Sequence, residues 1–121
     1  MIQRTYNCAL EAVDDKERIV IATDSEEIIE ECEKFNANCL ITSEKCLTGT
    51  DRVAEVSNLI EADQYINLQG DEPIFPKKEL ITFIDQSTKN KDLIHTAICQ
   101  IKNVDDFFNR SIPKMVFTRE N

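Results

Sequence analysis

Short runs of β-branched and aliphatic residues alternate along this chain with segments that repeat apolar residues every three to four positions. This alternation limits the possible folds most strongly. Two of the short runs, 18–23 and 39–42, have the length and composition of buried strands. Helical spacing is found in 2–13, in 26–35 and after Asp51. The pattern predicts an α/β fold with a mostly parallel sheet and flanking helices.

The rest of the chain continues the pattern. Further strands are predicted at 65–68, 93–101 and 114–118, and further helices at 76–87 and 103–109. No internal repeat or linker interrupts the sequence, so we predict one domain across 1–121. The order starts with a helix, whereas a doubly wound fold normally opens with a strand in the middle of its sheet.

Composition excludes several other classes of protein. With 2 glycines and 3 prolines the chain is not collagen-like or low-complexity, and 41% hydrophobic residues are enough for a packed core. No apolar run approaches the roughly 18 residues of a membrane span, and the N-terminus lacks the order of a signal peptide. A net charge of −9 repels phosphate backbones, so neither nucleic acid nor a membrane is an expected partner.

The five cysteines and the single histidine lack the spacing of a metal site. No two cysteines form a C-x-x-C motif, and His95 stands inside a predicted strand, where a structural role is commoner than a catalytic one. An odd number of cysteines without a secretion signal is typical of the reducing cytoplasm. We therefore expect buried or half-buried free thiols and no zinc site.

Two glycine-containing segments fall where an α/β sheet binds ligands, beyond the carboxyl ends of its strands. Gly49 precedes a helix, whose first N–H groups favour an anionic or polar ligand. Gly70 follows the predicted strand 65–68 in the turn Gln69–Pro73, which presents Asp71. A carboxylate there can hold Mg²⁺, and Mg²⁺ can hold substrate phosphates. An ordinary strand-to-helix turn explains the same residues equally well, because Gly, Asp and Pro are turn formers.

Structural roles are also favoured at two other polar positions. Before the helix that follows Gly49, the plainer interpretation is a helix cap by Thr50 or Asp51, with Arg52 as a solvated surface charge. Asp24 follows a predicted strand and stands in a helix-capping sequence, so a capping role is favoured over a ligand role.

Taken together, the two glycine segments resemble one enzyme family. Thr48-Gly-Thr-Asp-Arg52 before Val-Ala-Glu-Val, and then Gln69-Gly-Asp-Glu-Pro73 after a short apolar run, are similar to the motifs S-G-T-D-R-[ILV]-A-E and Q-G-D-E-P of the 3-deoxy-manno-octulosonate cytidylyltransferases, or CMP-KDO synthetases. Met1-Ile-Gln-Arg-Thr-Tyr6 looks like the family's first helix, and Val20-Ile-Ala-Thr-Asp24 looks like its V-A-T-D strand end. The resemblance covers essentially the whole chain.

The resemblance implies a Rossmann-like nucleotide-diphospho-sugar transferase fold and a Mg²⁺-dependent nucleotidyl transfer. The anomeric hydroxyl of an eight-carbon ulosonic acid would attack the α-phosphorus of CTP, giving CMP-sugar for lipopolysaccharide biosynthesis and pyrophosphate. Positioning and charge neutralisation would supply most of the rate. By position, Asp71 and Gln69 would be catalytic residues, with Asp71 as the metal ligand and Gln69 near the sugar or nucleotide. Thr48, Gly49 and Arg52 would line the cytidine side, and the complete enzyme would be a homodimer.

Several segments of the family have no counterpart in these 121 residues. They are the first strand, the Gly/Arg/Lys-rich loop P-A-R-x-x-S-x-R-L-P-G-K-P, the later sugar-binding residues and a second metal-binding aspartate. We therefore expect 1–121 to be a single partial cytidylyltransferase domain that is inactive alone. Its incomplete sheet would have a central gap, or 18–23 would pair directly with 65–69. Cys46-Leu47-Thr48 stands where the family often has His-Pro-Ser, although threonine keeps the hydroxyl group.

Two other functions stay open. A cytidylyltransferase for a related ulosonic acid, including an amino-substituted or sialic-type sugar, would differ in sugar-contacting residues that lie outside these 121 positions. A receiver-like α/β binding module would need an acidic cluster after its first strand and a lysine after its last. Asp24 is alone at its strand end, so this second class is disfavoured.

Overall fold

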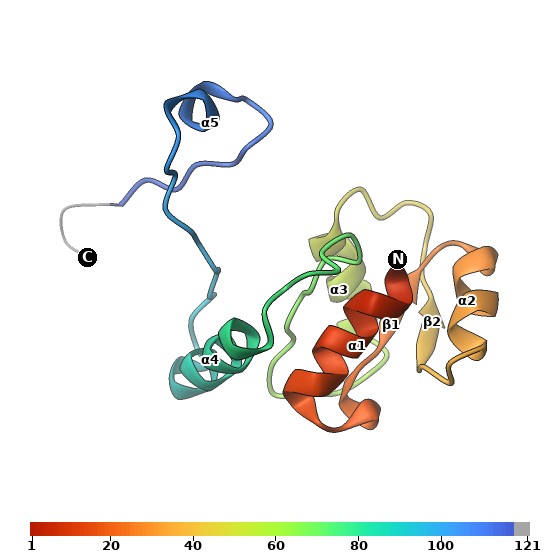
Figure 1. Ribbon diagram of the computed structural model, residues 1–121. Coiled ribbons are helices and arrows are strands. Elements are labelled where there is room, and N and C mark those ends of the chain that lie inside the picture. The colour runs from red at the N-terminus through yellow and green to blue at the C-terminus, as the bar shows by residue number, and fades with distance from the viewer. Residues whose placement is uncertain (118–121) are drawn as a thin grey trace.

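The computed structural model describes residues 1–117, and a small parallel sheet lies in its N-terminal part (Figure 1). β1 (Ile21–Thr23) pairs with β2 (Cys39–Ile41) in parallel, residue for residue along the three positions of each strand. The predicted α/β class and the parallel direction of these strands are confirmed. Both strands are shorter than the apolar runs 18–23 and 39–42 that predict them.

The helices occupy the segments predicted for them, with small changes at their ends. Their bounds are α1 (Ile2–Val13), α2 (Glu26–Glu33), α3 (Gly49–Ser57), α4 (Lys77–Ser87) and α5 (Val104–Phe108), and two 3-10 turns are η1 (Lys16–Arg18) and η2 (Thr88–Asn90). α2 ends before Phe35, and Asn36, the predicted stop, adopts the left-handed conformation with φ of 52°. The side chain of Asn103 caps α5.

The hydrophobic core lies between α1, β1 and α2. Tyr6, Ile21 and Cys32 are its buried members, one from each element. The ring of Tyr6 packs against Phe35 with the two ring centroids 5.3 Å apart. α1 and α2 therefore cover the face of β1 to which Ile21 points. Side chains alternate across a strand, so Ala22 points to the opposite face, where α3 contacts β1.

α1 also supports the later part of the chain. It packs against α4, which begins after Pro76 and buries Leu80. Two side chains of α1 reach the turn that follows residue 69. The Thr5 hydroxyl donates to the Gly70 carbonyl at 2.9 Å, and the Cys8 thiol donates to the Pro73 carbonyl at 3.5 Å. The turn is thus held by a helix about 65 residues earlier in the chain.

Three strand predictions are wrong within the described residues. No strand forms at 65–68, at 93–101 or at 114–117, and Thr118, the end of the last prediction, lies outside the described residues. A strand needs a neighbour to pair its backbone N–H and C=O groups. In the part of the chain that the structure describes, the sheet consists of β1 and β2. The later apolar runs lie away from it, as Figure 1 shows for the segment after α4.

The cysteines are free thiols. Cys32 is buried and three others are half-buried, as expected, but Cys99 is exposed. Burial raises the pKa of Cys32, and it raises the pKa of Cys39 to about 12. Both thiols are therefore protonated near neutral pH. No helix among residues 1–117 is long and apolar enough to cross a membrane.

Candidate functional site

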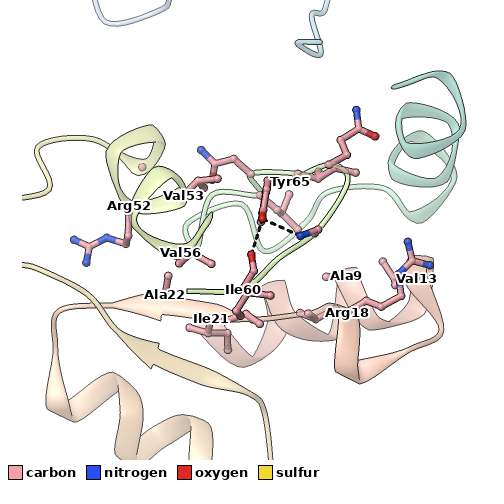
Figure 2. A pocket seen from close by; sticks show the side chains of 18 of the residues that line it. Ala9, Val13, Arg18, Ile21, Ala22, Arg52, Val53, Val56, Ile60 and Tyr65 are labelled. Atoms are coloured by element: carbon pink, nitrogen blue, oxygen red, sulfur yellow. Dashed lines mark hydrogen bonds between the residues drawn. The ribbon is translucent and has the colours of Figure 1, made fainter. Parts of the chain in front are cut away.

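A groove runs beside β1, and Figure 2 shows it from close by. Its volume is about 980 Å³, and α1, β1, α3, the segment 60–70 and α4 line it. Ala22, Val56, Ile60 and Tyr65 form part of its apolar wall. Of the two expected sheet arrangements, the structure therefore has the gap, and direct pairing of 18–23 with 65–69 is wrong.

The backbone of β1 explains why this edge is open. In a parallel pair, alternate residues direct both of their backbone groups toward the partner strand. The Ile21 N–H donates to the Asn38 carbonyl, and the Thr23 carbonyl accepts from the Thr42 N–H, so Ile21 and Thr23 face β2. The backbone groups of Ala22 point the other way, into the groove. No strand among residues 1–117 pairs with that edge.

The two glycine motifs meet at one end of the groove. A Cβ atom built at Gly49 would lie 2.9 Å from Gln69 Nε2 and 3.3 Å from Asn67 Nδ2. A Cβ atom essentially never comes within 3.0 Å of another heavy atom, so a side chain at position 49 would displace the Gln69 amide. Gly70 has more room, because its nearest neighbour would be Ile2 Cδ1 at 3.4 Å. The structure therefore places Gly49 and Gln69 side by side.

Asn67 is a residue of this site that the sequence motifs missed. Its side-chain amide lies beside that of Gln69 against Gly49. A signal was available in the sequence, because residues two apart in an extended segment point to the same side. The polar residue two positions before Gln69 therefore shares its surroundings, and this spacing is the signal that could have identified it.

A capping box starts α3. Thr48 Oγ1 accepts from the Asp51 N–H at 3.2 Å, and an Asp51 carboxylate oxygen accepts from the Thr48 N–H at 2.9 Å. The N-cap of α3 is therefore Thr48. The prediction that Thr50 or Asp51 caps this helix is wrong, because both residues lie inside its first turn. The Thr48 hydroxyl is held within the helix start, while the first N–H groups of α3 are left for a ligand or water.

Arg52 is a partner of two strand ends and not a solvated surface charge. Its Nη2 lies 2.9 Å from Asp24 Oδ2, and its Nη1 donates to Thr42 Oγ1. Asp24 and Thr42 directly follow β1 and β2, so Arg52 joins α3 to the carboxyl ends of both strands. The guanidinium of Arg52 holds the pKa of the Asp24 carboxyl below its ordinary value. The capping role predicted for Asp24 is wrong, because Ser25 is the N-cap of α2.

Glu55 of α3 holds the loop that leads to Thr48. Its carboxylate accepts from the Ser43 N–H at 3.0 Å and from the Cys46 thiol at 3.2 Å. The hydrogen bond to Glu55 raises the pKa of the Cys46 thiol. Arg52 and Glu55 together fix the start of α3 and the preceding loop to the sheet.

Asp71 and Glu72 lie in an exposed turn after the groove. The Glu72 N–H donates to the Gln69 carbonyl at 3.1 Å, and α1 holds the carbonyls of Gly70 and Pro73. Among residues 1–117, no three or more His, Cys, Asp or Glu side chains are grouped to hold a metal ion. Mg²⁺ that binds through one or two carboxylates and substrate phosphates needs fewer protein ligands. The exposed carboxylates of this turn fit that kind of binding.

Known proteins resemble this chain along its whole length. A family model described as cytidylyltransferase matches residues 1–121. The 3-deoxy-manno-octulosonate cytidylyltransferase of Thermodesulfovibrio yellowstonii is 38% identical, over 85% of this chain and 44% of its own. That of Legionella pneumophila strain Corby is 36% identical, over 100% of this chain and 49% of its own. The chain therefore spans about half the length of these relatives.

A solved structure agrees with the sequence relatives. It is CMP:2-keto-3-deoxy-manno-octonic acid synthetase complexed with CTP, which matches with a TM-score of 0.69 and 32% sequence identity. The match covers 76% of this chain and 38% of the other chain. The similarity therefore extends from the sequence to the arrangement of helices and parallel strands.

Proposed function

The chain belongs to the cytidylyltransferase family, and from this premise we propose that it forms the nucleotide-binding part of a 3-deoxy-manno-octulosonate cytidylyltransferase. The reaction would transfer a cytidylyl group from CTP to the sugar acid and release pyrophosphate. The observation that carries the proposal is the meeting of Gly49 with the amides of Asn67 and Gln69. The names of the relatives support the sugar acid, and the CTP-bound neighbour supports the nucleotide.

The cytidine would bind at the start of α3. An amide side chain offers both a donor and an acceptor, which suits the mixed hydrogen-bonding edge of a cytosine. Asn67 and Gln69 would supply such groups, because their amides lie against Gly49 at the start of the helix. Thr48 would border the same subsite. Arg52, which joins Asp24 and Thr42, would act at the cytidine side chiefly by holding α3 in place.

The triphosphate would need a cation in this acidic protein. A net charge of −9 opposes the approach of a polyanion. We place Mg²⁺ at the Asp71 carboxylate, with Glu72 next to it. When bound, the metal ion supplies neutralisation of the phosphate charge. The protein's own part is to orient the α-phosphorus toward the attacking sugar hydroxyl, because positioning accounts for much of such a reaction's rate.

Nucleotide binding by matched glycine variants tests the proposal. Gly49→Ala places a Cβ where the Gln69 amide lies, whereas Gly70→Ala makes an ordinary contact with Ile2. We expect titration calorimetry with CTP and Mg²⁺ to show about tenfold weaker binding for Gly49→Ala and nearly unchanged binding for Gly70→Ala. Gly49→Ala should unfold close to the wild type in urea, because the atoms that its Cβ would displace belong to the end of the flexible Gln69 side chain.

Two results would contradict the proposal. One is a wild-type protein that binds no CTP in the presence of Mg²⁺. The other is equal weakening by Gly49→Ala and Gly70→Ala, because the contact at position 49 would then have no special role. Asp71→Asn provides a third comparison, since it should remove the Mg²⁺ dependence of CTP binding while leaving cytidine binding in place.

A further inference from the structure

The turn Gly70–Pro73 is held at both of its ends by one helix. Thr5 Oγ1 donates to the Gly70 carbonyl at 2.9 Å, and Cys8 Sγ donates to the Pro73 carbonyl at 3.5 Å. Asp71 and Glu72 are the two residues between these carbonyls. Thr5 and Cys8 are three positions apart in α1, so they lie on the same side of the helix.

We propose that Thr5 is a positioning residue that, with help from Cys8, sets the orientation of the Asp71–Glu72 turn. The assignment of a metal-binding role to Asp71 rests on the proposed function, but the tether itself does not. On sequence alone, Thr5 has no role beyond its place in a predicted helix, because its hydrogen-bond partner is 65 residues away.

Thr5 is buried, so its hydroxyl depends on a hydrogen-bond partner within the protein. Only 4% of the residue is exposed, so the hydroxyl has little access to water. A buried hydroxyl without a partner is costly, and a threonine inside a helix normally donates to the carbonyl four residues earlier. Here the donor instead reaches the Gly70 carbonyl. Ile2 lies close to the same residue, because a Cβ atom added at Gly70 would lie 3.4 Å from Ile2 Cδ1.

The turn has little else to hold it in one orientation. Its own backbone supplies the hydrogen bond from the Glu72 N–H to the Gln69 carbonyl, at 3.1 Å. The side chains of Asp71 and Glu72 are exposed, and none of the ion pairs found among residues 1–117 includes them. The contacts with α1 therefore decide the direction in which the turn presents these carboxylates.

Two conservative variants separate the hydrogen bond from packing. Thr5→Val keeps the shape of the side chain and removes the hydroxyl, whereas Thr5→Ser keeps the hydroxyl and removes a methyl group. Amide hydrogen exchange of the ligand-free protein, read at Glu72, measures the stability of the turn. We expect exchange about tenfold faster in Thr5→Val and close to wild type in Thr5→Ser. Cys8→Ala should give a smaller acceleration, since a thiol is a weak donor.

A second measurement connects the tether to the proposed site. Titration of each protein with Mn²⁺ in the presence of CTP, followed by paramagnetic broadening at Asp71, reports metal binding at the turn. We expect binding to be about threefold to tenfold weaker in Thr5→Val and restored in Thr5→Ser. Wild-type protein that shows no broadening would contradict the proposed function, while faster Glu72 exchange in Thr5→Val would still support the tether.

The tether is wrong if Thr5→Val exchanges at Glu72 like the wild type. It is also wrong if Thr5→Ser loosens the turn as much as Thr5→Val does, because the methyl group would then be responsible. If Thr5→Val does not fold, the Cys8→Ala variant, which changes a half-buried residue, tests the tether instead. Unchanged Glu72 exchange in Cys8→Ala would then overturn the proposal, and faster exchange would support it.

Discussion

Residues 1–57 and residues 93–117 contain similar apolar runs in different surroundings. In the first region, Tyr6, Ile21 and Cys32 come from three elements and bury one another. In the second, large apolar side chains are exposed, and they are Leu93, Ile94, Ile98, Ile101, Val104, Phe107, Phe108, Met115, Val116 and Phe117. Figure 1 shows α5 and its flanking segments apart from the packed elements. Apolar sequence alone therefore does not create a core, because each element needs a surface to cover.

The largest expected effect contrasts an aromatic side chain from each region. Tyr6 is 6% exposed and packs against Phe35, whereas Phe107 is 59% exposed and its ring packs against that of Phe108. We expect Tyr6→Ala to lower the free energy of unfolding by about 3–5 kcal/mol, as for other large aromatic truncations in cores. Phe107→Ala should stay within about 0.5 kcal/mol of wild type. Urea unfolding measures both, and equal losses would remove the distinction between the regions.

Thiol chemistry gives the next contrast, between Cys39 in β2 and Cys99 in the exposed segment. Burial raises the pKa of the Cys39 thiol to about 12, from an ordinary value of 9.0. At pH 8 the Cys39 side chain is therefore almost entirely in the unreactive thiol form. We expect iodoacetamide to label Cys99 within minutes and to leave Cys39 unmodified until the protein unfolds. Mass spectrometry of digested samples reads both sites, and early labelling of Cys39 would show that β2 opens readily.

A smaller effect is expected at the contact between Asp24 and Arg52. The folded-state pKa of Asp24 is lowered, so the ion pair contributes stability above the ordinary pKa of 3.8. That contribution is lost as the pH falls through the folded-state pKa. Asp24→Asn should therefore be less stable than the wild type at pH 7, and the difference should shrink below pH 3.8. Thermal unfolding across this range tests the sign, and a difference independent of pH would rule out the ionic contribution.

The smallest effect is expected at the exposed segment after α4. Ile94 is fully exposed, so Ile94→Lys should change the free energy of unfolding by less than about 0.5 kcal/mol. Its visible consequence should be lower self-association, since exposed apolar patches promote contact between molecules. Sedimentation velocity compares the two proteins. A large loss of stability in Ile94→Lys would mean that this segment packs against the rest of the protein in solution.

Much of the fold was accessible from the sequence because the deciding signals are local. The bounds of α1 match the predicted 2–13, and Asn36 ends the α2 region in the left-handed conformation, as its side chain allows. The strand at 65–68 was wrong for a non-local reason. Its sequence is suitable, but the groove separates it from β1, and a strand cannot form without a partner.

The candidate site divides in the same way. Its two motifs were identifiable from the residue types at Gly49 and Gln69, and the carboxylate at Asp71 from its place in a turn. The role of Arg52 was not, because Asp24 and Thr42 lie 28 and 10 residues from it. Asn67 was missed for a simpler reason, since it stands outside the motif, two positions before Gln69.

By itself, then, the sequence determined the helices, the apolar runs from which strands could form, the family and the segments that carry the candidate chemistry. Each depends on side-chain periodicity, capping or short motifs, which act within a few residues. Tertiary structure alone decided which apolar runs became strands, that Gly49 meets Gln69, and that Thr5 holds Gly70. These are contacts between segments that are distant in the sequence. Their backbone and side-chain groups find hydrogen-bond or packing partners only when the chain folds and brings the segments together.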